Sequence, residues 1–329
     1  MFSACNGEII VDSERLENKG NYFEPLLNIM KIGEAYDFNS ICDVIYTQNY
    51  VVLSSDNKLL ICSNIKVPFE PKAEQNNLRE IIRKRLKTLR SFDNQVLCAE
   101  YGSSKLQVND IENALFYNIG TASFKNVLTN ETSVYFRRIQ PNEIYATEKV
   151  KFKYIYHYSW CPKREYVQWW GHHMLCQWNK IPLNKVNSAT KAFDYYSAIK
   201  KNPMLVKCLD KGGETQLGLK IQLFVPRTAT SFNVLNIMKP MIDGVICAFH
   251  TPCNIMVDEL SKRLSVNKEL FLLTENTCLN EYCYIKPYRN SVKWSPQDNK
   301  LDYVFIEPVI VDEDAFSFSG NLFAMTNHM

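Results

Sequence analysis

The apolar pattern is clearest between residues 74 and 92, where the chain reads EQNNLREIIRKRLKTLRSF. Most positions between the apolar residues of this segment are polar or basic. The apolar side chains recur at intervals of three and four residues, at Leu78, Ile81, Ile82, Leu86 and Leu89. This spacing predicts an amphipathic helix that buries its apolar face and leaves its basic side chains in solvent.

Other segments have the β-branched and aromatic composition of strands. Residues 41–63 predict a strand pair whose turn is the polar run 54–57. We expect further strands at residues 95–100, 133–139, 219–226, 269–273, 282–286 and 302–311.

A β-hairpin is predicted from residues 149–160, KVKFKYIYHYSW, and residues 165–178, EYVQWWGHHMLCQW. The run Cys161-Pro162-Lys163-Arg164 would form its loop. On a strand, alternation would place Lys149, Lys151 and Lys153 on one face with His157, and the aromatic residues on the other.

Helices are expected at residues 190–200, 233–250 and 255–264. Pro240 lies in the second of these, where it either begins the helix or kinks it. Residues 109–118 fit a helix that begins after Asn109-Asp110, although a strand is the alternative.

Short strands mixed with isolated helices, without regular βαβ alternation, predict an α+β fold. We expect mixed or antiparallel sheets, a few isolated helices and a β-rich middle region. No repeat or low-complexity linker interrupts the chain. Residues 1–329 are therefore expected to form one compact unit, or two closely packed lobes with a boundary near residues 120–145.

Length and composition narrow the class of protein. The 329 residues are 46% apolar and 22% charged, which excludes collagen and a mostly disordered chain. No window of 18 consecutive apolar residues exists, and the first residues do not resemble a secretory signal. The chain also has 11 cysteines, an odd number that complete internal pairing cannot satisfy. We therefore expect a cytoplasmic protein with free thiols and no membrane association.

The net charge of +3 conceals an uneven distribution along the chain. Residues 1–120 have a balance of −3, residues 121–230 of +10 and residues 231–329 of −4. The basic excess therefore lies in the β-rich middle of the chain.

A basic sheet surface with aromatic neighbours suits a nucleic acid, because cations bind phosphates and aromatic rings stack on bases. The alternative is an ordinary half-buried strand with its aromatic residues in the core and its lysines in water. The candidate nucleic-acid-binding residues are Arg137, Arg138, Lys149, Lys151, Lys153, Tyr154, Tyr156, Lys163 and Arg164.

The same hairpin would bring together His157, Cys161, His172 and Cys176, which are residue types that bind zinc. Their spacing matches no common zinc motif. An ordinary hairpin without a metal is therefore the alternative.

A third candidate site lies on the helix predicted at residues 233–250. Lys239, Asp243 and His250 would lie along one stripe of this helix, together with Cys247. A carboxylate and an imidazole in this arrangement could transfer protons or bind a metal. The alternative is structural, with a Lys239–Asp243 salt bridge and a cationic histidine at the helix end.

The segment Lys239-Pro240-Met241-Ile242-Asp243 is similar to the Lys-Pro-Asp-x-Asp-Asn motif of RusA-like Holliday-junction resolvases. This resemblance implies a divalent metal as cofactor and assigns the family's later aspartate to Asp298. The chain departs from the motif at two positions, because Met241 replaces the first aspartate and Gly244 the asparagine. Without paired aspartates the residues do not support a two-metal cleavage site.

These observations favour a nucleic-acid- or polyanion-binding protein that works in a larger assembly with a protein partner. A metal-dependent phosphodiesterase centred on Asp243 and Asp298 is one alternative, and the sequence leaves open whether the protein is an enzyme. Another is a protein-interaction subunit that docks through residues 312–329, where acidic and aromatic residues alternate.

Overall fold

The computed structural model describes most of the chain. The described residues are 2–5, 8–11, 43–90, 95–104, 110–129, 131–139, 152–163, 172–211, 216–229, 233–250, 256–274, 276–279, 285–294 and 300–325.

The chain divides into two compact units. Unit 1 consists of Met1–Val127 and Val134–Tyr166, and unit 2 of Leu128–Ser133 and Val167–Met329. Each unit contains its own set of paired strands and its own helices.

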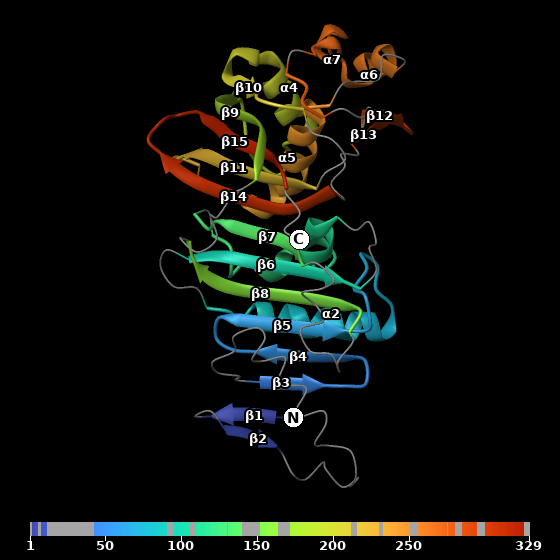
Figure 1. Cartoon of the computed structure of the whole chain (residues 1–329), viewed down its shortest axis with the longest axis vertical. Helices are drawn as coiled ribbons and strands as arrows, with labels where there is room; N and C mark the ends of the chain where they lie inside the picture. The colour runs from blue at the N-terminus through green and yellow to red at the C-terminus, as the bar shows by residue number, and fades with distance from the viewer. Residues whose placement is uncertain are drawn as a thin grey trace. The chain divides into compact units, whose positions relative to one another are not determined.

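Unit 1 is built on eight described strands. They are β1 (Phe2–Cys5), β2 (Glu8–Val11), β3 (Asp43–Tyr46), β4 (Tyr50–Ser54), β5 (Lys58–Ser63), β6 (Gln95–Ser103), β7 (Val134–Ile139) and β8 (Tyr154–Pro162). Their order is β7-β6-β8-β5-β4-β3-β1-β2 (Figure 1). The pair β6–β7 is parallel and the other neighbours are antiparallel.

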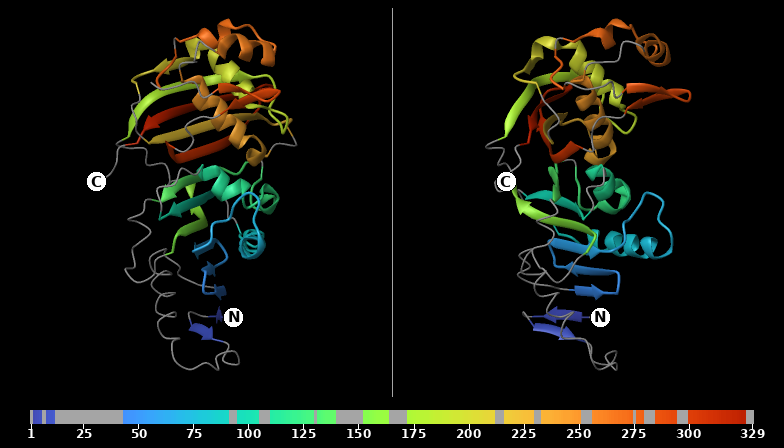
Figure 2. Two further views of the ribbon diagram at one scale, coloured as in Figure 1. Left: turned by 90° about the vertical axis from the view of Figure 1, so that its right-hand side faces the viewer. Right: turned by 45° about the vertical axis from the view of Figure 1, so that its right-hand side comes forward.

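Helix α2 (Ala73–Leu86) covers one face of this sheet (Figure 2). Its apolar residues Leu78, Ile82 and Leu86 are fully buried, as the spacing predicts. Between β6 and β7 the chain forms a π-helical turn at Asn113–Tyr117 and a 3-10 turn at Thr121–Phe124. The helix predicted in residues 109–118 is therefore confirmed, and the alternative of a strand is wrong. These turns provide the crossover that parallel strands require.

Five described strands of unit 2 form a sheet in the order β10-β9-β15-β11-β14 (Figure 1). Only the pair β11–β14 is parallel among these neighbours. The strands are β9 (His173–Leu183), β10 (Val206–Cys208), β11 (Leu217–Pro226), β14 (Leu301–Val311) and β15 (Phe316–Ala324).

Helices α4 (Ala192–Lys201) and α5 (Val234–Ala248) cover one face of the unit 2 sheet (Figure 2). Trp178 of β9 packs against Phe249, with ring centroids 5.5 Å apart, and Tyr195 meets Phe318 of β15 edge-on. Pro240 lies inside α5, so it does not begin the helix.

Smaller elements complete unit 2. A 3-10 turn at Pro203–Leu205 precedes β10, and a separate hairpin joins β12 (Ile285–Tyr288) to β13 (Ser291–Trp294). Helices α6 (Val257–Leu264) and α7 (Glu269–Leu272) lie between α5 and this hairpin in the chain.

Three expectations need correction. The predicted hairpin of residues 149–160 and 165–178 does not form, because β8 pairs with β5 and β6 in unit 1, whereas β9 pairs with β10 and β15 in unit 2. The predicted strand at 269–273 is helix α7, since four apolar residues fit either period.

The third correction concerns the predicted docking peptide at residues 312–329. Its residues Phe316–Ala324 form β15, which lies between β9 and β11. Phe318 is fully buried there. This part of the chain is therefore a central strand of unit 2.

The α+β fold class is confirmed, because both units combine mixed sheets with separate helices. In the described part of the chain, no helix combines the length and the apolar character that a membrane crossing requires.

Candidate functional site

The predicted basic face of unit 1 contains an acidic residue at its centre. Glu100 of β6 stands opposite Arg137 of β7 and His157 of β8, so the three side chains share one face. Its carboxylate accepts a hydrogen bond from Arg137 Nε at 2.5 Å, and its second oxygen lies 2.7 Å from His157 Nδ1. Arg137 therefore balances a carboxylate within the protein.

The charge of Glu100 is stabilised by these neighbours. Burial raises the pKa of its carboxyl group, but the hydrogen bond and charge of His157 and the charge of Arg137 outweigh that effect. The pKa of Glu100 falls to about 2 as a result. The carboxylate is consequently ionised at neutral pH.

The aromatic residues of β8 divide between core and surface. Tyr156 is fully buried, and its hydroxyl oxygen accepts a hydrogen bond from the backbone N–H of Val67 at 3.0 Å. A base cannot stack on Tyr156 as predicted, because the ring is fully buried and packs against Tyr101. Tyr154 is half-buried.

The remaining predicted binding residues are only partly described. Lys153 directly precedes β8, and Arg138 and Lys163 lie on β7 and after β8. Lys149, Lys151 and Arg164 lie outside the described residues, so the alternation predicted for the three lysines stays a prediction.

The four predicted zinc ligands belong to different units. His157 and Cys161 lie on β8 of unit 1, whereas His172 and Cys176 lie in unit 2. Among the residues that the structure describes, no group of three histidine, cysteine or acidic side chains is arranged to hold a metal ion. The hairpin that would have assembled these ligands does not form.

On helix α5 the structural alternative describes the geometry better. Lys239 Nζ lies 3.6 Å from Asp243 Oδ1, one turn along the helix, and the Asp243 side chain is 12% exposed. The helix ends at Ala248, so the buried His250 lies beyond it and does not continue the predicted stripe. Asp298 lies outside the described residues.

Gly244 has a packing role in α5. A Cβ atom at this position would lie 2.2 Å from the carbonyl oxygen of Ala192 and 2.9 Å from Cβ of Tyr195, both in α4. The glycine therefore permits the close contact of α4 with α5. This contact is a physical reason for glycine where the resolvase motif has asparagine.

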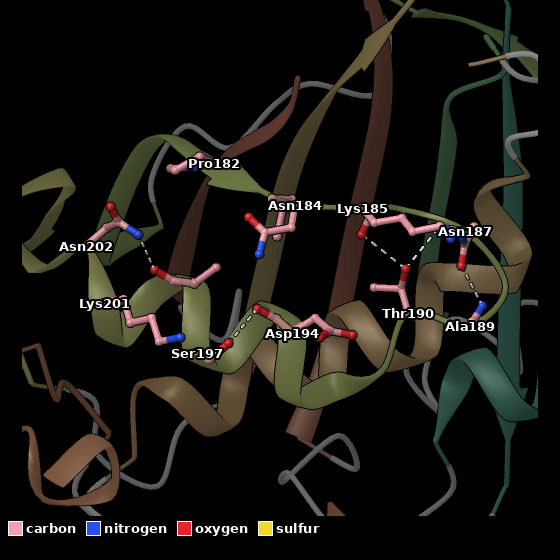
Figure 3. A pocket seen from close by; sticks show the side chains of 12 residues that line it. Pro182, Asn184, Lys185, Asn187, Ala189, Thr190, Asp194, Ser197, Lys201 and Asn202 are labelled. Atoms are coloured by element: carbon pink, nitrogen blue, oxygen red, sulfur yellow. Dashed lines mark hydrogen bonds between the residues drawn. The ribbon is translucent and has the colours of Figure 1, made fainter. Parts of the chain in front are cut away.

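Unit 2 contains a cavity of about 330 Å³ between the end of β9 and helix α4 (Figure 3). Its polar groups largely stabilise local turns: Thr190 Oγ1 donates to the carbonyl of Lys185, and Asn202 Nδ2 to that of Ala198. The Asp194 carboxylate accepts the Lys191 N–H at the start of the helix. This cavity therefore offers a ligand few uncommitted groups other than the side chains of Lys185 and Lys201.

A second hollow, of about 490 Å³, lies over the polar face of the unit 2 sheet, opposite α4 and α5. We call it the sheet hollow. Its lining comes from β9, β10, β11, β15 and the turn before β10, and comprises Gln177, Trp178, Asn179, Met204, Leu205, Val206, Lys207, Lys220, Gln222, Ser319, Gly320 and Asn321.

Strand register arranges the polar side chains of the sheet hollow in a row. Lys207 pairs with Gln177, Gln177 with Asn321, and Asn321 with Lys220, so four neighbouring strands each contribute one side chain to the same face. Strands lie about 4.8 Å apart, which places the backbones of the two lysines roughly 14 Å apart. The row therefore has a cation at each end and amides between.

A second polar row lies beside the first. Ser319 Oγ and Asn179 Oδ1 are hydrogen-bonded at 3.1 Å, and Gln222 Nε2 donates to Glu307 Oε2 at 2.8 Å. Glu307 is buried and is not part of the hollow's lining. Within the described residues, neither Lys207 nor Lys220 forms an ion pair, and both line the hollow.

Gly320 lies between Ser319 and Asn321 in β15 and makes room for Trp178 on the opposite, helix-covered face. A Cβ atom there would lie 2.3 Å from the Trp178 ring, which packs on the helical side of the sheet. Met204 and Leu205 border the hollow and are 94% and 40% exposed. The hollow thus combines cations, amides and an apolar rim.

The sequence prediction missed the sheet hollow although part of its signal was visible. Lys220 and Gln222 alternate with apolar residues in β11, a pattern typical of a strand with one polar face. The pairing of β15 with β9 and β11 brings Asn321 beside Gln177, more than a hundred residues away. No local pattern contains that pairing.

Comparison of the chain with protein-family models, curated proteins and solved structures gives no match.

Proposed function

We propose that unit 2 binds single-stranded nucleic acid across the sheet hollow. The observation that carries the proposal is the row Lys207–Gln177–Asn321–Lys220 on an exposed sheet face. Lysines at its two ends suit two separate phosphates of an extended strand, because phosphate binding is electrostatic. The amides between them can hydrogen-bond to base edges, and the exposed Met204 provides apolar contact.

An extended anion fits this surface better than a small one. A single phosphate would bind the lysine at one end of the row and leave the lysine at the other end without a partner. The basic balance of +10 in residues 121–230, which include Lys207 and Lys220, favours an anionic partner over a neutral one. A folded duplex would instead require an element shaped to enter a groove.

The test is a fluorescence anisotropy titration of the full chain with a labelled strand of about 12 nucleotides, within the range that single-strand-binding surfaces cover. We expect binding at low salt that weakens steeply as salt rises. Replacing both Lys207→Gln and Lys220→Gln should weaken binding at least about tenfold. It should also reduce the slope of log K against log salt by about 1.4, since each single-strand phosphate contact contributes about 0.7.

The matched control is the double variant Lys185→Gln with Lys201→Gln, which removes the same charge at the other cavity. The control should bind like the original protein. Equal losses in both double variants, or binding of an acidic peptide but not of nucleic acid, would contradict the proposal. Lys151→Glu with Lys153→Glu tests, in the same titration, the surface predicted from sequence.

A further inference from the structure

Three cysteine side chains meet on the helix-covered face of the unit 2 sheet. Cys176 comes from β9, Cys208 from β10 and Cys278 from the segment that pairs with the chain after α5. Burial and the neighbouring thiols of Cys208 and Cys278 raise the pKa of Cys176. This face is opposite the sheet hollow, because Lys207 and Gln177 alternate with Cys208 and Cys176.

Strand register brings two of these thiols into close contact. The N–H of Leu209 donates to the carbonyl of Leu175 at 2.8 Å, so this pair is hydrogen-bonded across the strands. The neighbouring pair, Cys208 with Cys176, is consequently a non-hydrogen-bonded pair. Such pairs have Cα atoms about 4.5 Å apart and the closest side chains in an antiparallel ladder.

A buried amine interacts electrostatically with Cys208 and Cys278. Lys200 of α4 is only 3% exposed, and its Nζ donates to the carbonyl of Leu273 at 2.9 Å. Burial lowers the pKa of Lys200 to about 8, against the opposing charges of Cys208 and Cys278. A nearby thiolate therefore stabilises the protonated, positively charged form of Lys200.

Cys208 differs in exposure from the six other cysteines whose burial the structure describes. Cys62, Cys98, Cys161, Cys176, Cys247 and Cys278 are buried, whereas Cys208 is half-exposed, and all seven are free thiols. Hydrogen bonds from Cys176 and Cys278 and the charge of Lys200 lower the pKa of Cys208, against the effect of burial. An exposed thiolate beside a cation is the usual setting of a reactive cysteine.

We propose that Cys208 is a modification site that reacts with small disulfides. The Cys208 thiolate attacks one sulfur of the disulfide, so that a bond forms between Cys208 Sγ and that sulfur while the original S–S bond breaks. The second half of the reagent leaves as a thiolate and takes a proton from water. The proposal is independent of nucleic-acid binding, which uses the other face of the sheet.

The test uses the reduced full chain and dipyridyl disulfide, a neutral reagent whose released thione absorbs light. Cys208→Ser should remove one fast-reacting equivalent per chain. Mass spectrometry of peptides from the original protein should find the adduct on Cys208. A fast phase that persists unchanged in Cys208→Ser, or an adduct on another cysteine in its place, would overturn the assignment.

The pH profile separates an activated thiol from one that is merely accessible. Between about pH 8 and about pH 6 the rate for glutathione should fall about 75-fold, as the thiolate of an ordinary thiol disappears. The rate for Cys208 should fall less than about 3-fold, because its thiolate persists. A Cys208 profile parallel to that of glutathione would refute the proposal.

Lys200→Met provides the structural check, because it removes the buried amine without leaving a polar group behind. We expect a lower rate at about pH 6 and a steeper pH profile than in the original protein. Lys201→Met removes the neighbouring exposed amine and should change neither. If Lys200→Met leaves the profile unchanged, the buried amine does not activate Cys208 and that part of the proposal is overturned.

Discussion

At the scale of single residues, Glu100 reduces the positive charge of the open face of unit 1. It holds one cationic group and one imidazole on neighbouring strands, Arg137 and His157. The carboxylate is only 13% exposed, so these contacts are poorly screened by water. The face is consequently less basic than the sequence of β7 and β8 alone suggests.

Replacement of this carboxylate tests its role. Glu100→Gln should destabilise the protein by about 2 kcal/mol at neutral pH, because Arg137 loses its charged partner. The folded-state pKa of about 2 lies below the ordinary value of 4.5, so Glu100 stabilises the fold above about pH 4.5. This contribution disappears as pH falls toward 2.

Denaturant unfolding at several pH values gives the measurement. The stability difference between the original protein and Glu100→Gln should be largest near neutral pH and shrink below about pH 4.5. Equal stability at neutral pH, or a difference that is independent of pH, would show that the carboxylate is not stabilised as described.

Alternation along β8 correctly predicts that His157 and Tyr156 occupy opposite faces. It does not predict which face is the core, so Tyr156 fits a binding surface and a buried position equally well. The partner Glu100 is 57 residues from His157, and only strand register brings the two together. Local patterns therefore predict faces but not partners.

At the scale of elements, the packing of unit 2 depends on the close contact of α4 with α5. Gly244 allows the α5 backbone to approach Ala192 and Tyr195. Both helices were predicted from their apolar spacing, and both begin within two residues of the predicted start. Their mutual packing depends on one missing side chain, a property that apolar spacing does not measure.

Gly244→Ala should destabilise unit 2 by about 1–3 kcal/mol, because the added methyl group would overlap α4. Intrinsic helix propensity predicts the opposite sign, since alanine favours a helix by about 1 kcal/mol over glycine. Thermal unfolding measures the effect. Asn236→Ala, at an exposed position of the same helix, is the control and should not destabilise the protein.

Pairing between elements was predicted less well than the elements themselves. The strands at 41–63, 95–100, 133–139 and 302–311 have close counterparts in the structure. The predicted partner of β8 was wrong. Several strands have similar composition and the same alternation, so the sequence does not distinguish which of them pairs with β8. The strand predicted at residues 269–273 was wrong, because a single helical turn and a short strand contain equally few apolar positions.

At the scale of the whole molecule, the basic middle of the chain is shared between the two units. Residues 121–230, with their balance of +10, cross the boundary at Tyr166–Val167. The sequence alone predicts a single surface from this charge. Segment sums cannot locate a surface, because they ignore where the chain leaves one core and enters another.

Separate cores predict independent responses to mutation. Glu100→Gln acts in unit 1 and Gly244→Ala in unit 2, and the two share no described partner. We expect their effects on the unfolding free energy to add within about 0.5 kcal/mol in the double variant. A coupling energy well above this value, measured by the complete double-mutant cycle, would contradict independence.

The place of β15 constrains how unit 2 forms during synthesis. Residues 316–324 follow every other described strand of the unit in the chain, yet they lie between β9 and β11. A nascent chain that has not reached them leaves those two strands with unpaired edges, which are templates for association with other chains. Protection of these edges therefore waits until residues 316–324 have left the ribosome, a delay during which chaperones would be most useful.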